Sequence, residues 1–352
     1  MKLQKFSEIR KIMKQCPSLD EDARAQAKAH EDRLTKPQGA LGRLEEFSAW
    51  AAAAQGKASP KCNHIRVAIY AGNHGIAKEG ISAYPPSVTA QMVENFRNGG
   101  AAVNQLCAEL DADLQVYELN LEQPCKNICH APAMSEDSCV RALCYGMLAV
   151  EDGIDLLCLG EMGIGNTASA SAMMMALHGG KSHMWVGPGT GVRGDALTHK
   201  IDKVEVAVSR ALEKNTKLSG LETLAQLGGF EFAALAGAII AARMAPVPVV
   251  LDGFACTATA ALLEHEVPGF LDHCQIGHCS AEPAHKRLLK ILKRDPVLDF
   301  SMRLGEGSGA VLAAMMIKSA IACHNGMATF AQAHVEGSIQ NTASTDKANA
   351  TL

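Results

Sequence analysis

The sequence has 352 residues, of which 48% are hydrophobic and 20% are charged, with a formal net charge of −4. This length and composition are typical of a globular protein with a large buried core and exclude an intrinsically disordered chain. The weak negative charge argues against a nucleic acid partner and against a membrane surface held by bulk electrostatics, and no basic cluster with interleaved aromatic residues is present.

The start of the sequence, Met1-Lys2-Leu3-Gln4-Lys5, lacks the apolar segment of a secretion signal. The most apolar run, residues 232–244, is shorter than the roughly 20 residues that a membrane span needs. The twelve cysteines are therefore expected to be reduced thiols in a cytoplasmic protein.

The first part of the sequence, residues 1–60, is expected to form a small helical domain. Its predicted helices are residues 22–34 and 41–54, because both runs consist of helix-forming residues bounded by breakers. A helix at about residues 325–337 is expected to join this domain. The polar tail, residues 338–352, has no apolar periodicity and is expected to be disordered.

Residues 61–324 are expected to form a large α/β domain, in which buried strands alternate with helices of ten or more residues. The predicted strands are residues 65–71, 114–121, 155–160 and 247–251, with a short strand after Leu271. This alternation predicts a parallel sheet covered by helices on both faces. The carboxyl ends of parallel strands share one edge, where open α/β sheets bind ligands.

Two glycine-rich loops are candidates for binding a phosphoryl group. The first glycine loop contains Gly163, Ile164, Gly165, Asn166 and Thr167, and the second contains Gly187, Pro188, Gly189, Thr190 and Gly191. A strand, a glycine-rich turn and a helix start form a cradle for an anion. Neither loop is a Walker A motif, because no Lys-Ser or Lys-Thr follows the glycines. One such loop is weak evidence, but two favour a phosphorylated ligand over ordinary turns.

Glu306 stands between Gly305 and Gly307, directly before an apolar helix predicted over residues 311–323. Glycines on both sides allow a tight turn and the close approach of a ligand. Ser308 is predicted to cap the helix, and the free N–H groups at its start are predicted to be available to an anion or a polar ligand. The alternative for Glu306 is an acidic residue placed in a first helical turn by the helix dipole.

Other polar residues also follow predicted strands: His74 in the loop of residues 72–75, Glu161 and Asp252. If the sheet is parallel, they converge with the glycine loops at one edge, where Glu306 can join them. For the His74 loop, an ordinary turn between a strand and a helix is an equally good interpretation.

Two groups of cysteine and histidine residues resemble metal sites only superficially. They are Cys125, Cys129 and His130, and His273, Cys274, His278 and Cys279. Neither group has the matching ligand pair of a zinc site, so no structural metal is expected.

Taken together, these stretches resemble the nicotinate-nucleotide–dimethylbenzimidazole phosphoribosyltransferase family over nearly the whole chain, the tail excepted. The matching segments are residues 36–45 (KPQGALGRLE), 72–75 (GNHG), 82–85 (SAYP), 88–93 (VTAQMV), 132–135 (PAMS), 159–167 (LGEMGIGNT), 187–191 (GPGTG), 251–254 (LDGF), 280–285 (SAEPAH) and 302–310 (MRLGEGSGA). So many motifs in one order make the resemblance highly specific.

The resemblance implies that phosphoribose passes from nicotinate mononucleotide to 5,6-dimethylbenzimidazole with inversion, giving α-ribazole 5′-phosphate and nicotinate, in the assembly of the adenosylcobalamin nucleotide loop. It implies a Rossmann-like large domain, a small helical domain built from both chain ends, and a homodimer. It also implies that Glu306 is the general base and that Glu161 lines the same site. No cofactor is implied, and since no pyrophosphate leaves, an obligatory Mg²⁺ is not expected.

Within this resemblance, we expect both glycine loops to hold the ribose phosphate, and Tyr84, Pro85 and Met92 to line an apolar pocket for the base. The opposite assignment is also open. Asp252 and Gly305 are expected to contribute to substrate binding. For Tyr84 and Met92, packing in the core is an equally good interpretation.

The chain departs from the family pattern at Asn73, Ala131 and Ala168, where Asp, Gly and Thr are usual. The first change removes a charge near His74, and the last removes a hydroxyl near the first glycine loop. Two alternatives therefore stay open. One is the same chemistry with adenine, another benzimidazole or a phenol as the acceptor. The other is a catalytically silent partner or nucleotide-binding subunit.

Overall fold

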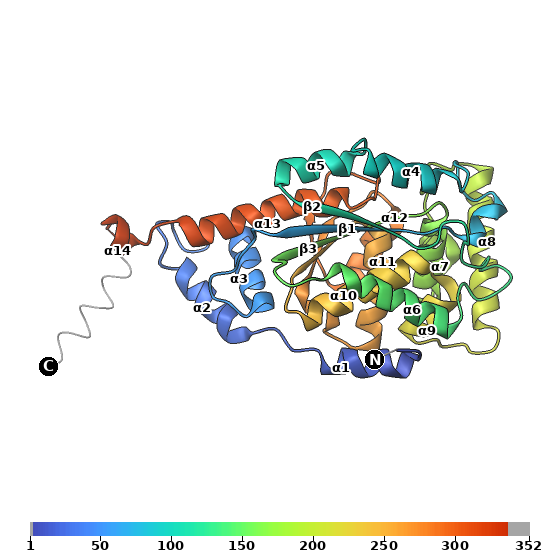
Figure 1. The fold of residues 1–352 in the computed structure, drawn as a ribbon, viewed down its shortest axis with the longest axis horizontal. Coiled ribbons are helices and arrows are strands. Elements are labelled where there is room, and N and C mark those ends of the chain that lie inside the picture. Colours follow the sequence, from blue (N-terminus) through green and yellow to red (C-terminus); the bar gives the residue numbers. More distant parts are fainter. Residues whose placement is uncertain (1–2, 337–352) are drawn as a thin grey trace. The chain divides into compact units, whose positions relative to one another are not determined.

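The computed structural model describes residues 3–336, and the chain forms two compact units (Figure 1). The larger unit contains residues 3–17 and 63–314, and the smaller unit contains residues 18–62 and 315–336. Each unit is built from two stretches that are far apart in the sequence. No helix in the described part of the chain is long and apolar enough to cross a membrane.

The division of the chain differs from the expected boundaries at both ends. Helix α1 (Phe6–Gln15) belongs to the larger unit, because its apolar stripe of Phe6, Ile9 and Met13 is buried in that unit's core. Residues 315–324, in the second part of the long helix α13 (Ser308–Gly326), belong to the smaller unit, where His324 contacts Glu31 and the carbonyl oxygen of Ala58. The expected disordered tail, residues 338–352, lies outside the described residues.

The core of the larger unit is a sheet of six parallel strands in the order β2-β1-β3-β4-β5-β6, which confirms the predicted Rossmann-like architecture. The strands are β1 (Ile65–Ala71), β2 (Asp113–Glu118), β3 (Leu156–Met162), β4 (Val249–Leu251), β5 (Cys274–His278) and β6 (Pro296–Leu298). The strand order reverses between β1 and β3, so the loops that follow these two strands flank the switch point, where such sheets bind ligands.

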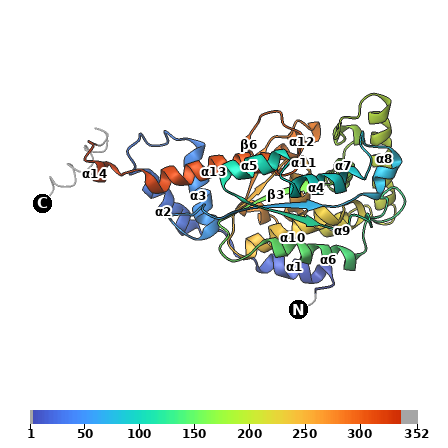
Figure 2. The ribbon, with the colours of Figure 1, turned by 45° about the horizontal axis from the view of Figure 1, so that its top comes forward.

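Helices cover both faces of the sheet, with α4 and α5 on one face and α6, α9 and α10 on the other (Figures 1 and 2). The helices of the larger unit are α1, α4 (Val88–Arg97), α5 (Ala102–Leu110), α6 (Glu136–Gly146), α7 (Asn166–His178), α8 (Asp195–Leu212), α9 (Gly220–Leu227), α10 (Phe230–Met244), α11 (Phe254–Glu266), α12 (Pro283–Leu292) and the first part of α13. Short 3-10 turns, η1 to η4, span Gly75–Glu79, Met147–Ala149, Ser182–Met184 and Phe270–His273.

Helix α10 is apolar on nearly all sides because it is buried between the sheet and α6. The two helices cross with their backbones in close approach. A Cβ atom on Gly146 would lie 1.7 Å from the carbonyl oxygen of Ala234, and one on Gly237 would lie 1.9 Å from that of Leu143. Only glycine fits at these two positions, and the crossing fixes the start of α10 beside the sheet edge.

The smaller unit consists of α2 (Glu21–Glu31), α3 (Arg43–Gln55), the second part of α13 and α14 (Phe330–Ala333). A buried polar network joins them. Lys36 Nζ lies 3.3 Å from a carboxylate oxygen of Glu31 and 2.7 Å from one of Glu45, and His324 Nδ1 lies 2.8 Å from Glu31 Oε1. Because each buried charge has an opposite partner, the network avoids the large cost of an isolated buried ion.

Candidate active site

The first glycine loop connects β3 to α7 at the switch point of the sheet. Glu161, near the end of β3, is buried, and its carboxylate accepts a hydrogen bond from the side-chain amide of Asn166, the first residue of α7. Gly165 has a φ of +96°, so the turn into the helix needs a residue without a Cβ atom. The structure therefore places Glu161 beside the predicted phosphate cradle.

The loop that carries Glu306 packs directly against β3. A Cβ atom on Gly160 would lie 2.4 Å from the backbone nitrogen of Gly307, and one on Gly305 would lie 3.1 Å from Glu161 Oε1. The backbones meet because both sides lack side chains. Glu161 and the Glu306 loop, which are expected from the sequence to converge, are thus brought together.

Glu306 has a left-handed backbone conformation, with a φ of +64°, and only 7% of its surface is exposed. The flanking Gly305 and Gly307 have φ values of +83° and +76°. A non-glycine residue in this region costs roughly 1 kcal/mol or more and persists only where its surroundings enforce it. The strained conformation aims one specific side chain, which is a common feature of functional sites.

Asp252, directly after β4, enforces this conformation. Its carboxylate accepts hydrogen bonds from the backbone N–H groups of Gly307 (3.1 Å) and Ala310 (3.0 Å). The prediction that Ser308 caps α13 is wrong, since the Ser308 hydroxyl donates to the carbonyl oxygen of Gly305 at 2.8 Å. The prediction that the N–H groups at this helix start are open to a ligand is wrong for the two that Asp252 occupies.

Burial sets the protonation of the carboxyl groups in the site. Burial, helped by the negative charge of Asp252, raises the pKa of Glu306 to about 7. Burial, followed by the charges of Asp252, Glu231 and Glu306, raises the pKa of Glu161 to about 8, against the hydrogen bond from Asn166. At neutral pH, Glu161 is therefore mostly protonated, whereas Glu306 can exchange a proton readily.

The two glycine loops are joined by Lys200, a residue that no motif in the sequence indicates. Its ammonium group donates to Thr167 Oγ1 and to the carbonyl oxygen of Gly187, each at 3.0 Å. Only 1% of Lys200 is exposed, and burial lowers its pKa to about 8, against the attraction of Glu282. A mostly protonated cation between two glycine loops is suited to binding a phosphoryl group.

Side chains from distant segments fix the second glycine loop. Glu282 accepts a hydrogen bond from the backbone N–H of Gly189 at 2.8 Å, and Arg303 donates to the carbonyl oxygen of the same residue at 3.3 Å. Thr190 Oγ1 lies 3.0 Å from the Ser82 hydroxyl and accepts from the backbone N–H of Ala83 at the same distance. The loop is thereby connected to the segments that carry Tyr84 and Glu306.

The predicted base-pocket residues follow the Ser82–Ala83 contact with this loop and differ in burial. Tyr84 is 55% exposed, Pro85 is exposed and Met92 is half-buried. The alternative interpretation, that Tyr84 packs in the core, is therefore wrong. A large exposed aromatic side chain beside a site is available to contact a ligand or a partner.

Two of the positions that depart from the family pattern, Asn73 and Ala168, have structural roles. Asn73 donates from its side-chain amide to the carbonyl oxygen of Leu121 at 2.9 Å. Ala168 is fully buried in the first turn of α7. Both residues support the loops without adding a charge to them.

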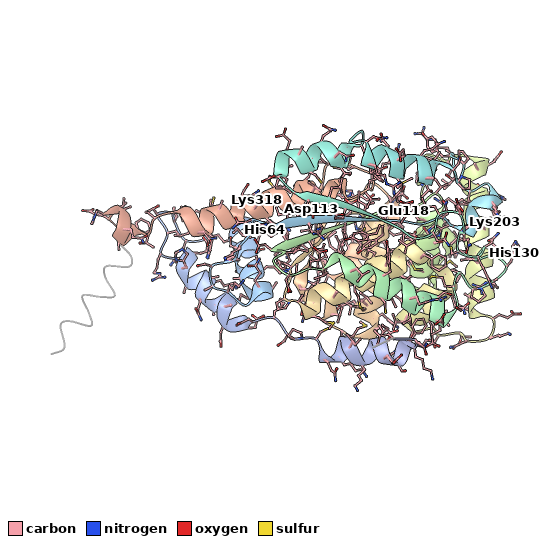
Figure 3. All side chains as sticks on the ribbon, in the orientation of Figure 1. His64, Asp113, Glu118, His130, Lys203 and Lys318 are labelled. Carbon is pink, nitrogen blue, oxygen red and sulfur yellow. The ribbon has the colours of Figure 1, made fainter. Side chains whose placement is uncertain are left out.

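The cysteine and histidine residues of the first apparent metal motif make other contacts. Cys129 donates to the carbonyl oxygen of Lys203, and His130 lies 3.2 Å from the carboxylate of Glu79, which also binds Lys203 at 2.6 Å. Figure 3 shows His130 and Lys203 at the same end of the larger unit. In the described part of the chain, no group of three or more His, Cys, Asp or Glu side chains is arranged to hold a metal ion.

Comparison with known proteins places this chain in a family. A family model described as phosphoribosyltransferase matches residues 16–335. The chain is 52% identical over 332 residues to the nicotinate-nucleotide–dimethylbenzimidazole phosphoribosyltransferase of Rhizobium etli, covering 94% of this chain and 97% of the relative. It is 50% identical over 333 residues to the protein of the same name from Brucella anthropi, covering 95% of this chain and 98% of the relative.

The fold has a close counterpart among solved structures. The crystal structure of CobT from Thermus thermophilus matches with a TM-score of 0.83 at 38% identity, covering 90% of this chain and 100% of that chain. The doubly wound sheet and the lysine-bridged glycine loops thus belong to an α/β enzyme of the phosphoribosyltransferase class. The chain is a member of the nicotinate-nucleotide–dimethylbenzimidazole phosphoribosyltransferase family, and the resemblance of its motifs is confirmed.

Proposed function

We propose that this protein transfers phosphoribose from nicotinate mononucleotide to 5,6-dimethylbenzimidazole, giving α-ribazole 5′-phosphate and nicotinate, with Glu306 as the general base. The reaction serves assembly of the adenosylcobalamin nucleotide loop. The relatives that share half of its residues carry the name of this reaction. The observation that carries the proposal is Glu306 itself, a buried carboxyl in an enforced left-handed conformation with a pKa of about 7.

The reaction needs one proton acceptor. The bond between ribose C1 and the pyridinium nitrogen breaks, and its electron pair neutralises the ring, so nicotinate leaves without a general acid. The imine nitrogen of the azole attacks C1 from the opposite face, which inverts the β-nucleotide to an α-product. The second ring nitrogen of the azole then loses its proton to Glu306, whose pKa near neutrality suits a general base.

Glu161 differs from Glu306 in its proposed role. Its pKa of about 8 keeps most of it protonated at neutral pH, so it can donate a hydrogen bond to a substrate oxygen or nitrogen. Its neutral form also spares Glu306 a second adjacent negative charge. Burial raises the pKa of both carboxyl groups, and it raises that of Glu161 further than that of Glu306.

The phosphoryl group is proposed to bind between the two glycine loops. Lys200 supplies the positive charge, and Thr167 supplies a hydroxyl within hydrogen-bond distance of it. Holding the phosphate there fixes ribose C1 relative to Glu306, and such positioning contributes a large part of the rate enhancement of a two-substrate reaction. Tyr84, Pro85 and Met92 are left to contact the apolar acceptor base.

The test is turnover of nicotinate mononucleotide with 5,6-dimethylbenzimidazole by the wild type and Glu306→Gln. Loss of a general base typically lowers the rate by about 10²–10⁴-fold, and we expect Glu306→Gln to keep binding the nucleotide. Near-full activity of this variant would move the base elsewhere, first to Glu161. Offering adenine, other benzimidazoles and phenol in parallel measures the acceptor preference, because phenol requires O–H rather than N–H deprotonation.

A catalytically silent nucleotide-binding subunit is the competing function. It predicts that the wild type binds nicotinate mononucleotide but turns it over with none of the acceptors. The intact Glu306 geometry favours the enzyme.

We further propose that the protein is a cytoplasmic homodimer. Its cysteines are thiols, most of them buried, which suits a reducing compartment. The exposed Tyr84 beside the site is suited to a subunit interface. Sedimentation of the wild type and Tyr84→Ala would measure the state directly, and a monomeric wild type would contradict the dimer.

A further inference from the structure

A buried ion pair lies beneath the first glycine loop and has no role in the chemistry described above. His74 follows β1, Glu231 is the second residue of α10, and the Nε2 atom of His74 contacts Glu231 Oε1. Both side chains are completely buried. Burial opposes the charge on His74, yet the facing carboxylate of Glu231 holds its pKa well above the ordinary range. The raised pKa favours the protonated form of His74, so the contact is an ion pair.

The second ring nitrogen of His74 reaches the helix that follows the first glycine loop. Its Nδ1 atom lies 3.0 Å from the hydroxyl of Ser169 in the first turns of α7, and 3.8 Å from Cys125 Sγ. One ring nitrogen thus faces Glu231 and the other faces Ser169. One side chain thus connects the ends of β1, α7 and α10.

Three glycine backbones pack directly on this pair. A Cβ atom on Gly163 would lie 2.5 Å from the carbonyl oxygen of Gly72 and 3.4 Å from the His74 ring, and one on Gly229 would lie 2.5 Å from the same ring. A Cβ atom on Gly72 would lie 2.8 Å from Glu231 Oε2. Gly163 is the first residue of the first glycine loop, so that loop rests on the ion pair.

Stability alone is a poor explanation for these two charges. A buried ion pair often contributes less stability than apolar residues of the same volume, because both ions lose their water. Glu231 Oε2 is buried without a hydrogen-bond partner among the described residues, which adds to the cost. Such an arrangement is retained more readily where it fixes a geometry that function needs.

We infer that His74 and Glu231 are positioning residues, which hold the first glycine loop in the conformation that binds the phosphoryl group of the substrate. The inference rests on the proposed function, since that function supplies the phosphorylated ligand. Neither side chain touches the substrate. They act through Gly163, whose backbone they support, and through Ser169 in α7.

The experiment compares Glu231→Gln with the wild type, using nicotinate mononucleotide and its analogue without the phosphoryl group, nicotinate riboside. A loop displaced by a fraction of an ångström binds phosphate poorly, and we expect the KM for nicotinate mononucleotide to rise at least about tenfold. The KM values for the riboside and for 5,6-dimethylbenzimidazole should stay within about twofold of those of the wild type, because neither molecule carries the phosphoryl group that the loop binds.

Glu266→Gln is the matched control. Glu266 is also a buried carboxylate in an ion pair of the larger unit, with Arg10 at 2.9 Å, and it contacts neither glycine loop. Its KM values should equal those of the wild type. The double variant His74→Gln/Glu231→Gln should raise the KM for the mononucleotide no further than the larger single change, because the two residues act as one unit.

An unchanged KM for nicotinate mononucleotide in Glu231→Gln, or an equal rise for the riboside, would overturn the positioning role. If Glu231→Gln does not fold, Ser169→Ala tests the same connection while leaving the ion pair intact. A selective rise in the mononucleotide KM supports the inference, and no rise overturns it. An inactive wild type would instead overturn the proposed function, so the two failures are distinguishable.

Discussion

Replacement of Glu306 by glutamine should inactivate the protein and yet stabilise it at alkaline pH. The pKa of Glu306 rises from 4.5 to about 7, chiefly because the carboxyl is buried. At about 1.4 kcal/mol per pH unit, ionising this carboxyl in the folded protein costs at most about 3–4 kcal/mol more than ionising it in the unfolded chain. Glutamine has the same shape and never ionises.

The raised pKa of Glu306 determines how the stability difference between the two proteins changes with pH. Well below pH 4.5, Glu306 is protonated in both the folded and the unfolded state, so its stability contribution is fully present. As the pH rises through about 7, that contribution is lost, because the folded state must release a proton that it holds tightly. We therefore expect equal stability of the two proteins well below pH 4.5, and a gain approaching about 3–4 kcal/mol for Glu306→Gln at pH 8.5.

The assay follows unfolding of the larger unit by tryptophan emission. The chain has two tryptophans, and Trp185 is fully buried in the larger unit. A Trp50→Phe background leaves Trp185 as the single reporter, and urea unfolding is measured at pH 5 and pH 8.5. The charge of Glu306 is one cause of the raised pKa of Glu161, so removing that charge also lowers the pKa of Glu161 and adds to the stability gain at pH 8.5.

A stability difference that does not change with pH would refute this reasoning, because it would show that Glu306 ionises as freely in the folded protein as in water. A loss of stability at pH 8.5 would refute it more strongly. Either result would also remove the basis for Glu306 as a base poised near neutrality.

Lys200→Met should raise the KM for nicotinate mononucleotide at least about tenfold. Binding of the nucleotide to the wild type should weaken above pH 8, because Lys200, with its pKa of about 8, loses its proton there. A binding affinity that does not change with pH in calorimetry would contradict this. Gly160→Ala should lower turnover by about 100-fold, because the new Cβ atom would lie 2.4 Å from the Gly307 nitrogen and displace Glu306. The control is Gly326→Ala, whose Cβ atom would meet no atom within 4 Å, and its turnover should equal that of the wild type. Equal turnover of the two variants would contradict this reasoning. Tyr84→Ala should raise the KM for the benzimidazole but not for the mononucleotide in the same kinetic assay; the reverse pattern would exchange the two substrate positions.

Much of the fold can be predicted from local patterns. Strand β1 is observed over the predicted residues 65–71, because a fully buried parallel strand is a continuous apolar run bounded by polar residues. Strand β6 (Pro296–Leu298) escapes prediction, since it is short, lies at the sheet edge and begins with a proline. The expected place of helix α1 in the smaller unit is wrong because adjacency in the sequence does not determine which core an apolar stripe joins.

Part of the candidate site can likewise be predicted from local motifs, and part cannot. The glycine loops and Glu306 stand in short motifs that a sequence can display. The roles of Asp252 and Lys200 depend on contacts between residues that are far apart in the chain, so no local motif indicates them. One signal is available for Lys200, which lies on the buried stripe of α8 with Val204 and Val208, where a lysine is unexpected.

Asp252 has a consequence for the strength of the base. A helix start ordinarily stabilises a nearby anion and makes an acid stronger. Here the Asp252 carboxylate already occupies the backbone N–H groups of Gly307 and Ala310, and it adds its own negative charge beside Glu306. Glu306 is thereby denied the usual compensation and holds its proton more tightly. Asp252 therefore partly determines the pKa of Glu306. Replacing Asp252 by an uncharged residue would lower that pKa and shift the pH at which the protein works, without altering Glu306 itself.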